Sequence, residues 1–257
     1  MVSDIQKIND RHDTAQYLKK HRITAGAIWQ SIMRYNNPAW GVYNGEKLTG
    51  LFVKNEKWRE VRIHGGDESA AKTLFFSLKK GKWHLFDFPS RYLPLVETLG
   101  RVSVEEPAIL FKNRAKKPLI QNYKGPITTL KLADAPLVHK RWGLDKDKEM
   151  VAFFKRRIAQ GPTSAIEING ELVAWAGTYH HTPWVTQLGY LHVEKGHRRN
   201  GYGMAVAVDI INKALSKGRI PLVHVFDTNY PSLNMIKKLK FVPVEKRFWG
   251  SVVIGKT

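Results

Sequence analysis

Two pairs of segments recur in the same order along the chain, and this repeat constrains the fold more than any other feature. The first pair is "GVYNGEKLTGLF" (Gly41–Phe52) and "AIEINGELVAWAG" (Ala165–Gly177), in which Asn-Gly-Glu separates two apolar runs. The second pair is "HLFDFPSRYLPLVETLGRVSV" (His84–Val104) and "HVFDTNYPSLNMIKKLKFVPV" (His224–Val244). Asn-Gly between such runs predicts a β-hairpin, and the second pair predicts a strand, a short helix and a strand. The repeat therefore predicts a duplicated α/β domain.

The two copies differ in the interval between these pairs. Asn44 and His84 are 40 residues apart, whereas Asn169 and His224 are 55 apart, so the second copy holds 15 additional residues. We predict one domain over residues 1–111 and another over residues 127–257. A basic segment with two prolines, residues 112–126, is expected to link them.

The longer interval contains "EKGHRRNGYGMAVAVDII" (Glu194–Ile211), which joins a predicted strand to a predicted helix. A helix N-terminus carries unsatisfied N–H groups and the positive end of the helix dipole, which together favour an anion. Gly201 and Gly203 allow the backbone to approach a bulky anion, and Arg198 and Arg199 can add charge-assisted hydrogen bonds. The alternative is an ordinary turn with solvated arginines. The order of strand, basic loop, glycines and helix favours an anion site.

The motif "RRNGYG" resembles the Arg/Gln-x-x-Gly-x-Gly/Ala signature of the GCN5-related N-acetyltransferases (GNAT), whose loop holds the pyrophosphate of coenzyme A. "DTNYPSLNMIKKLKF" is similar to the later motif of the same superfamily, and the resemblance covers about residues 127–250. It is greatest to the glycine N-acyltransferase-like branch, which has two folds in tandem. The resemblance implies an α/β protein with a mixed sheet and two tandem acetyltransferase-like folds, of which the N-terminal copy is degenerate.

The resemblance also implies a function and a set of cofactor contacts. The co-substrate would be acetyl-CoA or another acyl-CoA, and the acceptor a primary amine such as an amino acid. The strand before the loop would run beside the pantetheine arm, the loop would wrap the pyrophosphate, and two residues of the later motif would face the cofactor. The residues implied are Leu191, His192, Val193, Arg198, Arg199, Asn200, Gly201, Tyr202, Gly203, Met204, Asn229 and Ser232.

The sequence departs from the family pattern where catalytic groups are expected. Ile236 occupies the position at which many members have a tyrosine acid, and Lys240 replaces a glycine. Gln187 occupies the position at which the branch has a glutamate base. An amide does not accept a proton at neutral pH, so the base must lie elsewhere or be absent.

Several groups are alternatives for the base, which would deprotonate the acceptor amine. We prefer His181, because it is expected in a loop near the acceptor and its reference pKa suits the task. His192 on the strand and Tyr230 acting through water are the other candidates. Positioning of an amine that loses its proton to solvent is a further alternative.

Composition limits the remaining possibilities. The chain has no cysteine, which excludes disulfides and thiolate metal sites and favours a reducing, cytoplasmic location. No histidine or acid spacing predicts a metal site, and no apolar run predicts a membrane span. The net charge of +20 favours anionic partners, with nucleic acid among them. A coenzyme A-binding protein without catalysis and a nucleic-acid-associated acetyltransferase therefore stay open, and the oligomeric state is not predicted.

Overall fold

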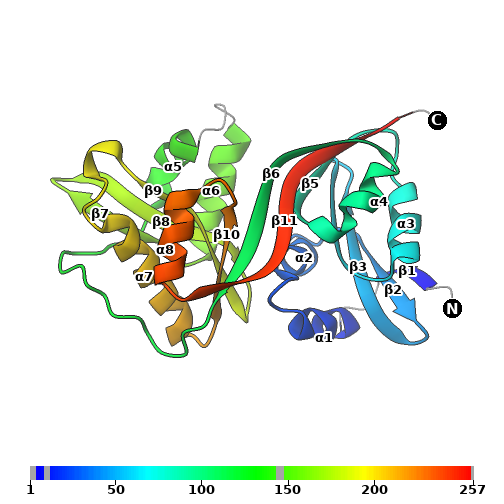
Figure 1. The fold of residues 1–257 in the computed structure, drawn as a ribbon, viewed down its shortest axis with the longest axis horizontal. Helices are drawn as coiled ribbons and strands as arrows, with labels where there is room; N and C mark the ends of the chain where they lie inside the picture. The colour runs from blue at the N-terminus through cyan, green and yellow to red at the C-terminus, as the bar shows by residue number, and fades with distance from the viewer. Residues whose placement is uncertain (1–3, 9–11, 143–147, 256–257) are drawn as a thin grey trace. The chain divides into compact units, whose positions relative to one another are not determined.

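The computed structural model describes residues 4–8, 12–142 and 148–255 (Figure 1). Contacts within the chain define two compact units. The first unit consists of Met1–Leu110, Val225–Asn229 and Pro243–Thr257, and the second consists of Phe111–His224 and Tyr230–Val242.

The first unit is a sheet with helices packed against it. Its strands lie in the order β1-β2-β3-β4-β5-β11-β6, with β4 and β5 parallel. The strands are β1 (Asp4–Lys7), β2 (Ala39–Asn44), β3 (Lys47–Asn55), β4 (Glu60–Gly65), β5 (Gly81–Pro89), β6 (Gly100–Asn113) and β11 (Phe241–Ile254). The helices are α1 (His12–Lys20), α2 (Gly26–Trp29), the π-helical turn η1 (Gln30–Arg34), α3 (Glu68–Phe76), the 3₁₀ turn η2 (Ser90–Tyr92) and α4 (Leu93–Glu97).

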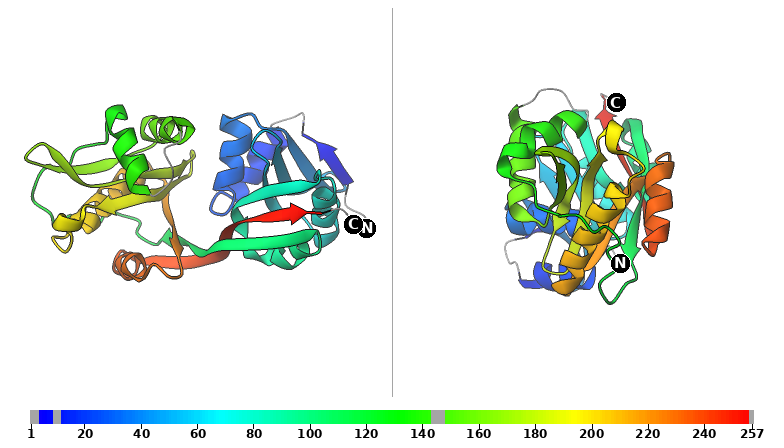
Figure 2. Two further views of the ribbon diagram at one scale, coloured as in Figure 1. Left: turned by 90° about the horizontal axis from the view of Figure 1, so that it is seen from above. Right: turned by 90° about the vertical axis from the view of Figure 1, so that its left-hand side faces the viewer.

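The second unit has strands in the order β10-β9-β8-β7, with β9 and β10 parallel. The strands are β7 (Ser164–Ile168), β8 (Glu171–His181), β9 (Val185–Val193) and β10 (Ile220–Phe226). The helices are η3 (Leu132–Asp134), α5 (Ala135–Trp142), α6 (Lys148–Gln160), η4 (Lys195–His197), α7 (Tyr202–Ser216) and α8 (Tyr230–Lys238). Helices α5 and α6 cover one face of this sheet and α7 covers the other (Figure 2). None of the described helices has the length and hydropathy that a membrane-spanning helix needs.

The repeat predicted from sequence is confirmed at the level of elements. Each copy runs through helices, a hairpin, a strand, a helix, a strand, a helix and a final strand. The hairpins even share a one-residue bulge, at Thr49 in β3 and at Val173 in β8. Their turns are offset by one residue, because Asn44 still pairs with Lys47 in β2–β3, whereas Asn169 lies within the turn of β7–β8. In the two hairpins, the residues that are structurally equivalent therefore differ by one position from those that the sequence repeat aligns.

The two units differ from the domains predicted from sequence in the course of the last strand. β11 pairs antiparallel with β5, from Arg247↔Pro89 to Ile254↔Gly81, and so most of it belongs to the first unit. The segment expected to be a linker also does more than connect. The backbone N–H and C=O of Leu119 both bond to the side chain of Asn212 on α7, at 2.7 and 2.9 Å. Gln121 donates to the carbonyl of Ala205 at 3.0 Å, so the segment is fixed along α7.

A polar network lies buried in the first unit. The guanidinium of Arg247 bonds to the side chain and carbonyl of Asp87 and to Glu245, at 2.7 to 3.0 Å. Nearby, His64 of β4 is 5% exposed, with Nδ1 at 2.8 Å from the hydroxyl of Tyr17 and Nε2 at 2.8 Å from that of Thr24. Burial, aided by the charge of Arg247, lowers the pKa of His64 to about 3. The folded unit therefore holds this imidazole neutral.

This neutral imidazole makes stability depend on pH. Below pH ~6.5 the unfolded chain protonates His64 while the folded chain does not, so the free energy of unfolding falls as the pH falls from ~6.5 toward ~3. One such group contributes a slope of up to about 1.4 kcal/mol per pH unit, which urea denaturation between pH ~7.5 and ~5 can measure. His64→Gln should reduce the slope, whereas replacement of the exposed His12 by Gln should preserve it. Equal slopes in both variants would contradict the assignment.

Candidate functional site

The parallel strands β9 and β10 separate part-way along their length. Their pairing runs from Val185↔Ile220 to Leu188↔Val223 and ends there, although β9 continues to Val193. The second half of β9 therefore leaves its neighbour at a defined point. Such a separation exposes backbone N–H and C=O groups that a ligand can bond.

A bulge in β9 follows directly after this point. Gly177↔Gly189 and Trp175↔His192 are paired on β8, so Tyr190 and Leu191 together face one residue of the partner strand. Tyr190 has a φ of +36°. Its ring occupies the space above Gly177, where any Cβ would collide with it. β-Bulges re-aim side chains and interrupt the hydrogen-bond ladder, and they are frequent beside active sites.

The faces of β9 are assigned by its contacts. Leu191 and Val193 lie against Gly203 of α7, whose Cβ would come within 3.3 Å of the Val193 side chain. His192 faces the opposite side, with its ring 4.7 Å from that of Trp175. Burial lowers the pKa of His192, and Glu194 opposes this effect. His192 therefore lies on the α5 and α6 face, away from the α7 N-terminus.

The loop between β9 and α7 contains two residues with a left-handed backbone conformation. Arg199 and Gly201 both adopt left-handed conformations, with φ of +67° and +78°. Within the described residues, no side chain caps the N-terminus of α7. Arg198, Arg199 and Asn200 are exposed around it. The first N–H groups of α7 thus point into a basic, glycine-containing turn.

Two of these side chains are held by local bonds. Arg198 donates from Nε to the carbonyl of Val193 at 3.2 Å, and Asn200 donates to the carbonyl of His197 at 3.3 Å. Tyr202 packs edge-to-face on Tyr123, with ring centroids 5.6 Å apart. The structure therefore brings Arg198–Met204 together with Leu191 and Val193. The role of these residues in holding a cofactor stays a prediction.

The first copy has a shorter connection at this point, with different chemistry. Between β4 and α3, the adjacent Gly65 and Gly66 adopt positive φ, whereas in the second copy Arg199 and Gly201 do. Here Asp67 caps the helix, and its carboxylate accepts a hydrogen bond from the N–H of Ala70 at 2.7 Å. The hydroxyl of Tyr92 also bonds to the carbonyl of Gly65 at 2.7 Å. A carboxylate at the helix N-terminus takes the place that an anion would need.

Gln187 is buried on β9, one residue before the pairing with β10 ends. Its side-chain Nε2 lies 2.8 Å from Nδ1 of His224, the residue of β10 that follows the last pair. Because an amide N–H₂ only donates, Nδ1 accepts, and neutral His224 then carries its proton on Nε2. On β8, the residue opposite Gln187 is the buried His180. Sequence analysis missed His224, although it lies in the repeated "HVFD" segment.

His181 lies elsewhere. Its Nδ1 is 3.1 Å from the hydroxyl of Thr186, the residue adjacent to Gln187, and adjacent strand residues point to opposite faces. His181 lines a depression with Lys213, Ser216 and Lys217, at the C-terminal end of α7. The structure therefore does not bring His181 together with Gln187 or with the α7 N-terminus.

The later motif divides between the units. Asn229 belongs to the first unit by its contacts and is exposed, whereas Ser232 lies in the first turn of α8 in the second unit. Ile236 is buried on α8 and Tyr230 is 70% exposed at its start. The role predicted for Asn229 and Ser232 stays a prediction.

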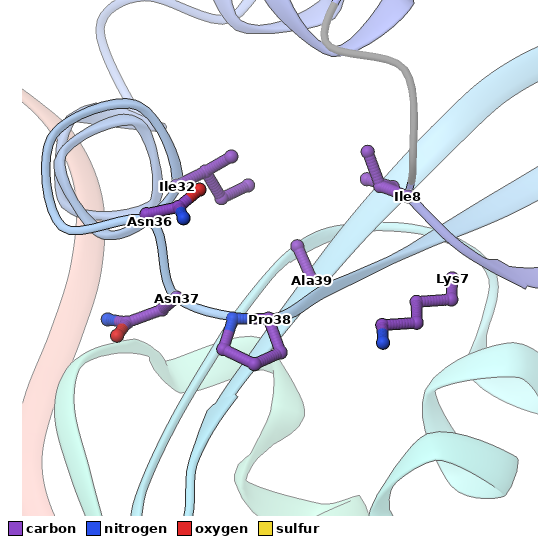
Figure 3. Close-up of a pocket in the computed structure, with 7 residues that line it drawn as sticks. All are labelled: Lys7, Ile8, Ile32, Asn36, Asn37, Pro38 and Ala39. Carbon is purple, nitrogen blue, oxygen red and sulfur yellow. The ribbon is translucent and has the colours of Figure 1, made fainter.

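A pocket in the first unit offers different chemistry (Figure 3). Its lining residues are Lys7, Ile8, Ile32, Asn36, Asn37, Pro38 and Ala39. These seven include no histidine and no acid. The lining of this pocket therefore offers no imidazole or carboxylate that could act as a general base.

Comparison with known proteins agrees with this geometry. Residues 167–250 match a family described as FR47-like protein. The fold is similar to that of a Drosophila protein (14% identity, TM-score 0.72, 99% of this chain and 100% of that one). It is also similar to a GNAT-family acetyltransferase from Colwellia psychrerythraea (14%, 0.59, 97% and 99%). A third similar structure is a tandem GNAT protein from the clavulanic acid biosynthesis pathway (11%, 0.61, 99% and 99%).

The fold is that of the GCN5-related N-acetyltransferases. The tandem α/β arrangement predicted from sequence is thereby confirmed. The glycine N-acyltransferase-like branch is named by none of these matches and stays a prediction.

The conformation of the GNAT-type loop can be tested without a ligand. The Cβ of an alanine at Gly201 would meet no atom within 4 Å, so Gly201→Ala adds only the strain of a left-handed L-residue. We expect it to lower the free energy of unfolding by about 1 kcal/mol, measured by chemical denaturation. Gly196→Ala is the matched control, since that Cβ also meets no atom and φ is not positive. Equal stability of the two variants would contradict the loop conformation.

Proposed function

We propose that the second unit binds an acyl-CoA and transfers its acyl group to a primary amine. The observation that carries this proposal is the uncapped, basic N-terminus of α7 beside the bulged second half of β9. Helix N-termini of this kind bind phosphate through N–H groups and the helix dipole. The degenerate copy, capped by Asp67, provides an internal comparison.

The loop suits a pyrophosphate in particular. Gly201 presents no Cβ toward the open space of the turn, and Arg198 and Arg199 are exposed in the residues just before it. A pyrophosphate needs several donors in one place, and arginine adds charge-assisted bonds to those of the backbone. The pantetheine arm would then follow the exposed edge of β9, from Val193 toward the bulge.

The acyl end of such a ligand would approach the point at which β9 and β10 separate. His224 is the first residue of β10 beyond this point, and Gln187 fixes its ring. With its proton on Nε2, His224 is suited to donate a hydrogen bond rather than to act as a base. We assign Gln187 as the positioning residue for His224.

The reaction needs few groups. The neutral amine nitrogen attacks the thioester carbonyl and forms the amide bond, the carbon–sulfur bond breaks, and coenzyme A leaves as a thiolate that takes up the proton released by the acylated nitrogen. A hydrogen bond from His224 would stabilise charge on the carbonyl oxygen or on the departing sulfur, and donors of this kind contribute to catalysis of acyl transfer. The amine would lose its proton to water before attack. In this role His224 would replace the tyrosine acid that many members of the superfamily have at the position of Ile236.

Gly201→Glu tests the phosphate cradle. The new carboxylate would stand at the helix N-terminus, as Asp67 does in the first copy, and we expect binding of acetyl-CoA in calorimetric titration to be lost. Gly218→Glu is the matched control: Gly218 also has a positive φ and an open Cβ direction, but it lies at the other end of α7. It should retain binding. Loss in both variants, or in neither, would remove the loop from the proposal.

His224→Gln tests the catalytic assignment. We expect kcat to fall by roughly 10²-fold, the lower range for loss of one catalytic donor, while the affinity for acetyl-CoA is unchanged. His84→Gln changes the histidine that matches His224 in the repeated sequence and should leave kcat unaltered. Gln187→Leu should lower kcat without changing acetyl-CoA binding, because it frees the ring. An unaltered rate in His224→Gln, or an equal loss in His181→Gln, would contradict the assignment.

A further inference from the structure

Two basic segments that are distant in sequence meet in the second unit. One is "KNRAKK" (Lys112–Lys117), which begins with the last two residues of β6, and the other is the end of α8 with the turn after it, residues 237–240. The side chain of Asn113 donates to the carbonyl of Leu239 at 2.6 Å. The N–H of Arg114 donates to the carbonyl of Lys240 at 3.2 Å. These two bonds fix the segments against each other.

The result is a concentrated positive surface, called here the basic cluster. Its members are Lys112, Arg114, Lys116, Lys117, Lys237, Lys238 and Lys240. All but the half-buried Lys112 are exposed. Residues 111–126 and 230–242 contain no aspartate or glutamate. Of the ion pairs found within the described part of the chain, none involves a member of the basic cluster.

The cations of the basic cluster have no ion pair with an acidic side chain among the described residues, whereas other cations of the chain do. Arg141 pairs with Glu194, Lys213 with Asp209, and Arg247 with Asp87. Gathering seven like charges without such partners opposes folding through mutual repulsion. An external polyanion would relieve the repulsion.

The cluster is separate from the phosphate cradle. Leu119, which follows the first segment of the cluster, bonds to Asn212, and Asn212 lies about 15 Å along α7 from Tyr202 at the N-terminus of that helix. Coenzyme A carries only a few phosphates, which the cradle at α7 would engage. The basic cluster therefore needs a second anionic partner.

The chemistry of the surface favours nucleic acid over a folded protein. Interfaces between proteins have an apolar core. In the two segments of the cluster every exposed side chain is cationic, while Leu239 and Asn113 are buried. Contacts of cations with phosphates need no apolar core and supply most of the sequence-independent affinity for nucleic acid. We propose that the basic cluster binds the phosphodiester backbone of nucleic acid without sequence specificity.

The test is fluorescence anisotropy with a labelled duplex DNA of about 20 base pairs, titrated at several salt concentrations. Wild type should bind, with an affinity that falls linearly in a plot of log K against log salt. Lys237→Gln/Lys238→Gln/Lys240→Gln should weaken binding roughly 10-fold or more and reduce the salt slope by about 1 per lost contact. The same positions changed to arginine should retain binding.

A control separates the cluster from the net charge. Lys19→Gln/Lys57→Gln/Lys80→Gln removes the same charge from exposed positions of the first unit and should leave the affinity within about 2-fold of wild type. Circular dichroism and thermal denaturation establish that each variant is folded. Absence of binding by wild type at low salt, or equal losses in the two triple variants, would overturn the proposal. So would polyglutamate that displaces the duplex at equal charge concentration, since an acidic polypeptide would then be the fitting partner.

Discussion

The separation of β9 from β10 is the constraint on which the candidate site depends. Two parallel strands that stayed paired would satisfy each other's backbone groups along their whole length and would leave nothing for a ligand. Pairing ends at Leu188↔Val223, and the bulge at Tyr190 follows two residues later. The positive φ of Tyr190 is costly for a residue with a side chain. It is tolerated because Gly177 leaves room for the ring.

The two copies share one topology and differ in whether side chains of the same unit bond to the backbone groups that the separated strands expose. β4 and β5 also separate early, after Val61↔Leu85, but side chains of the first unit use the exposed backbone groups. Arg62 donates to the carbonyl of Phe86, and Tyr92 donates to that of Gly65. Asp67 caps the following helix. In the first copy, side chains of the same unit thus bond to these backbone groups and cap the helix, whereas in the second copy no side chain caps α7 within the described residues. In the first copy, Arg62, Asp67 and Tyr92 thus occupy bonds of the kind that the proposed ligand would make in the second copy.

Local sequence patterns predicted the elements and the loop, because their causes are local. Gly218 ends α7 with a φ of +65°, Asn169 and Gly170 form a turn with positive φ, and Gly201 begins the helix. Gln187 was also singled out, as a departure from the base that the resemblance implies, and this interpretation stays a prediction. Its partner His224 was not found, because the two residues are 37 positions apart in the sequence and come together only through the parallel pairing of β9 and β10. The place of β11 beside β5 has the same origin. Pairing between distant strands leaves no mark in a short stretch of sequence.

Charge and topology act together in the second unit. The net charge of +20 alone does not distinguish a solvated surface from a binding surface. Two backbone-directed bonds, from Asn113 and Arg114, convert separate lysine-rich stretches into one surface without acids. The same unit presents the uncapped N-terminus of α7. The two proposed surfaces are different kinds of anion site on one unit. The site for acyl-CoA consists mainly of backbone N–H groups around a glycine turn, and the site for a polyanion consists of side-chain cations. Only the affinity for the polyanion should fall steeply with salt, because counterions screen exposed charges.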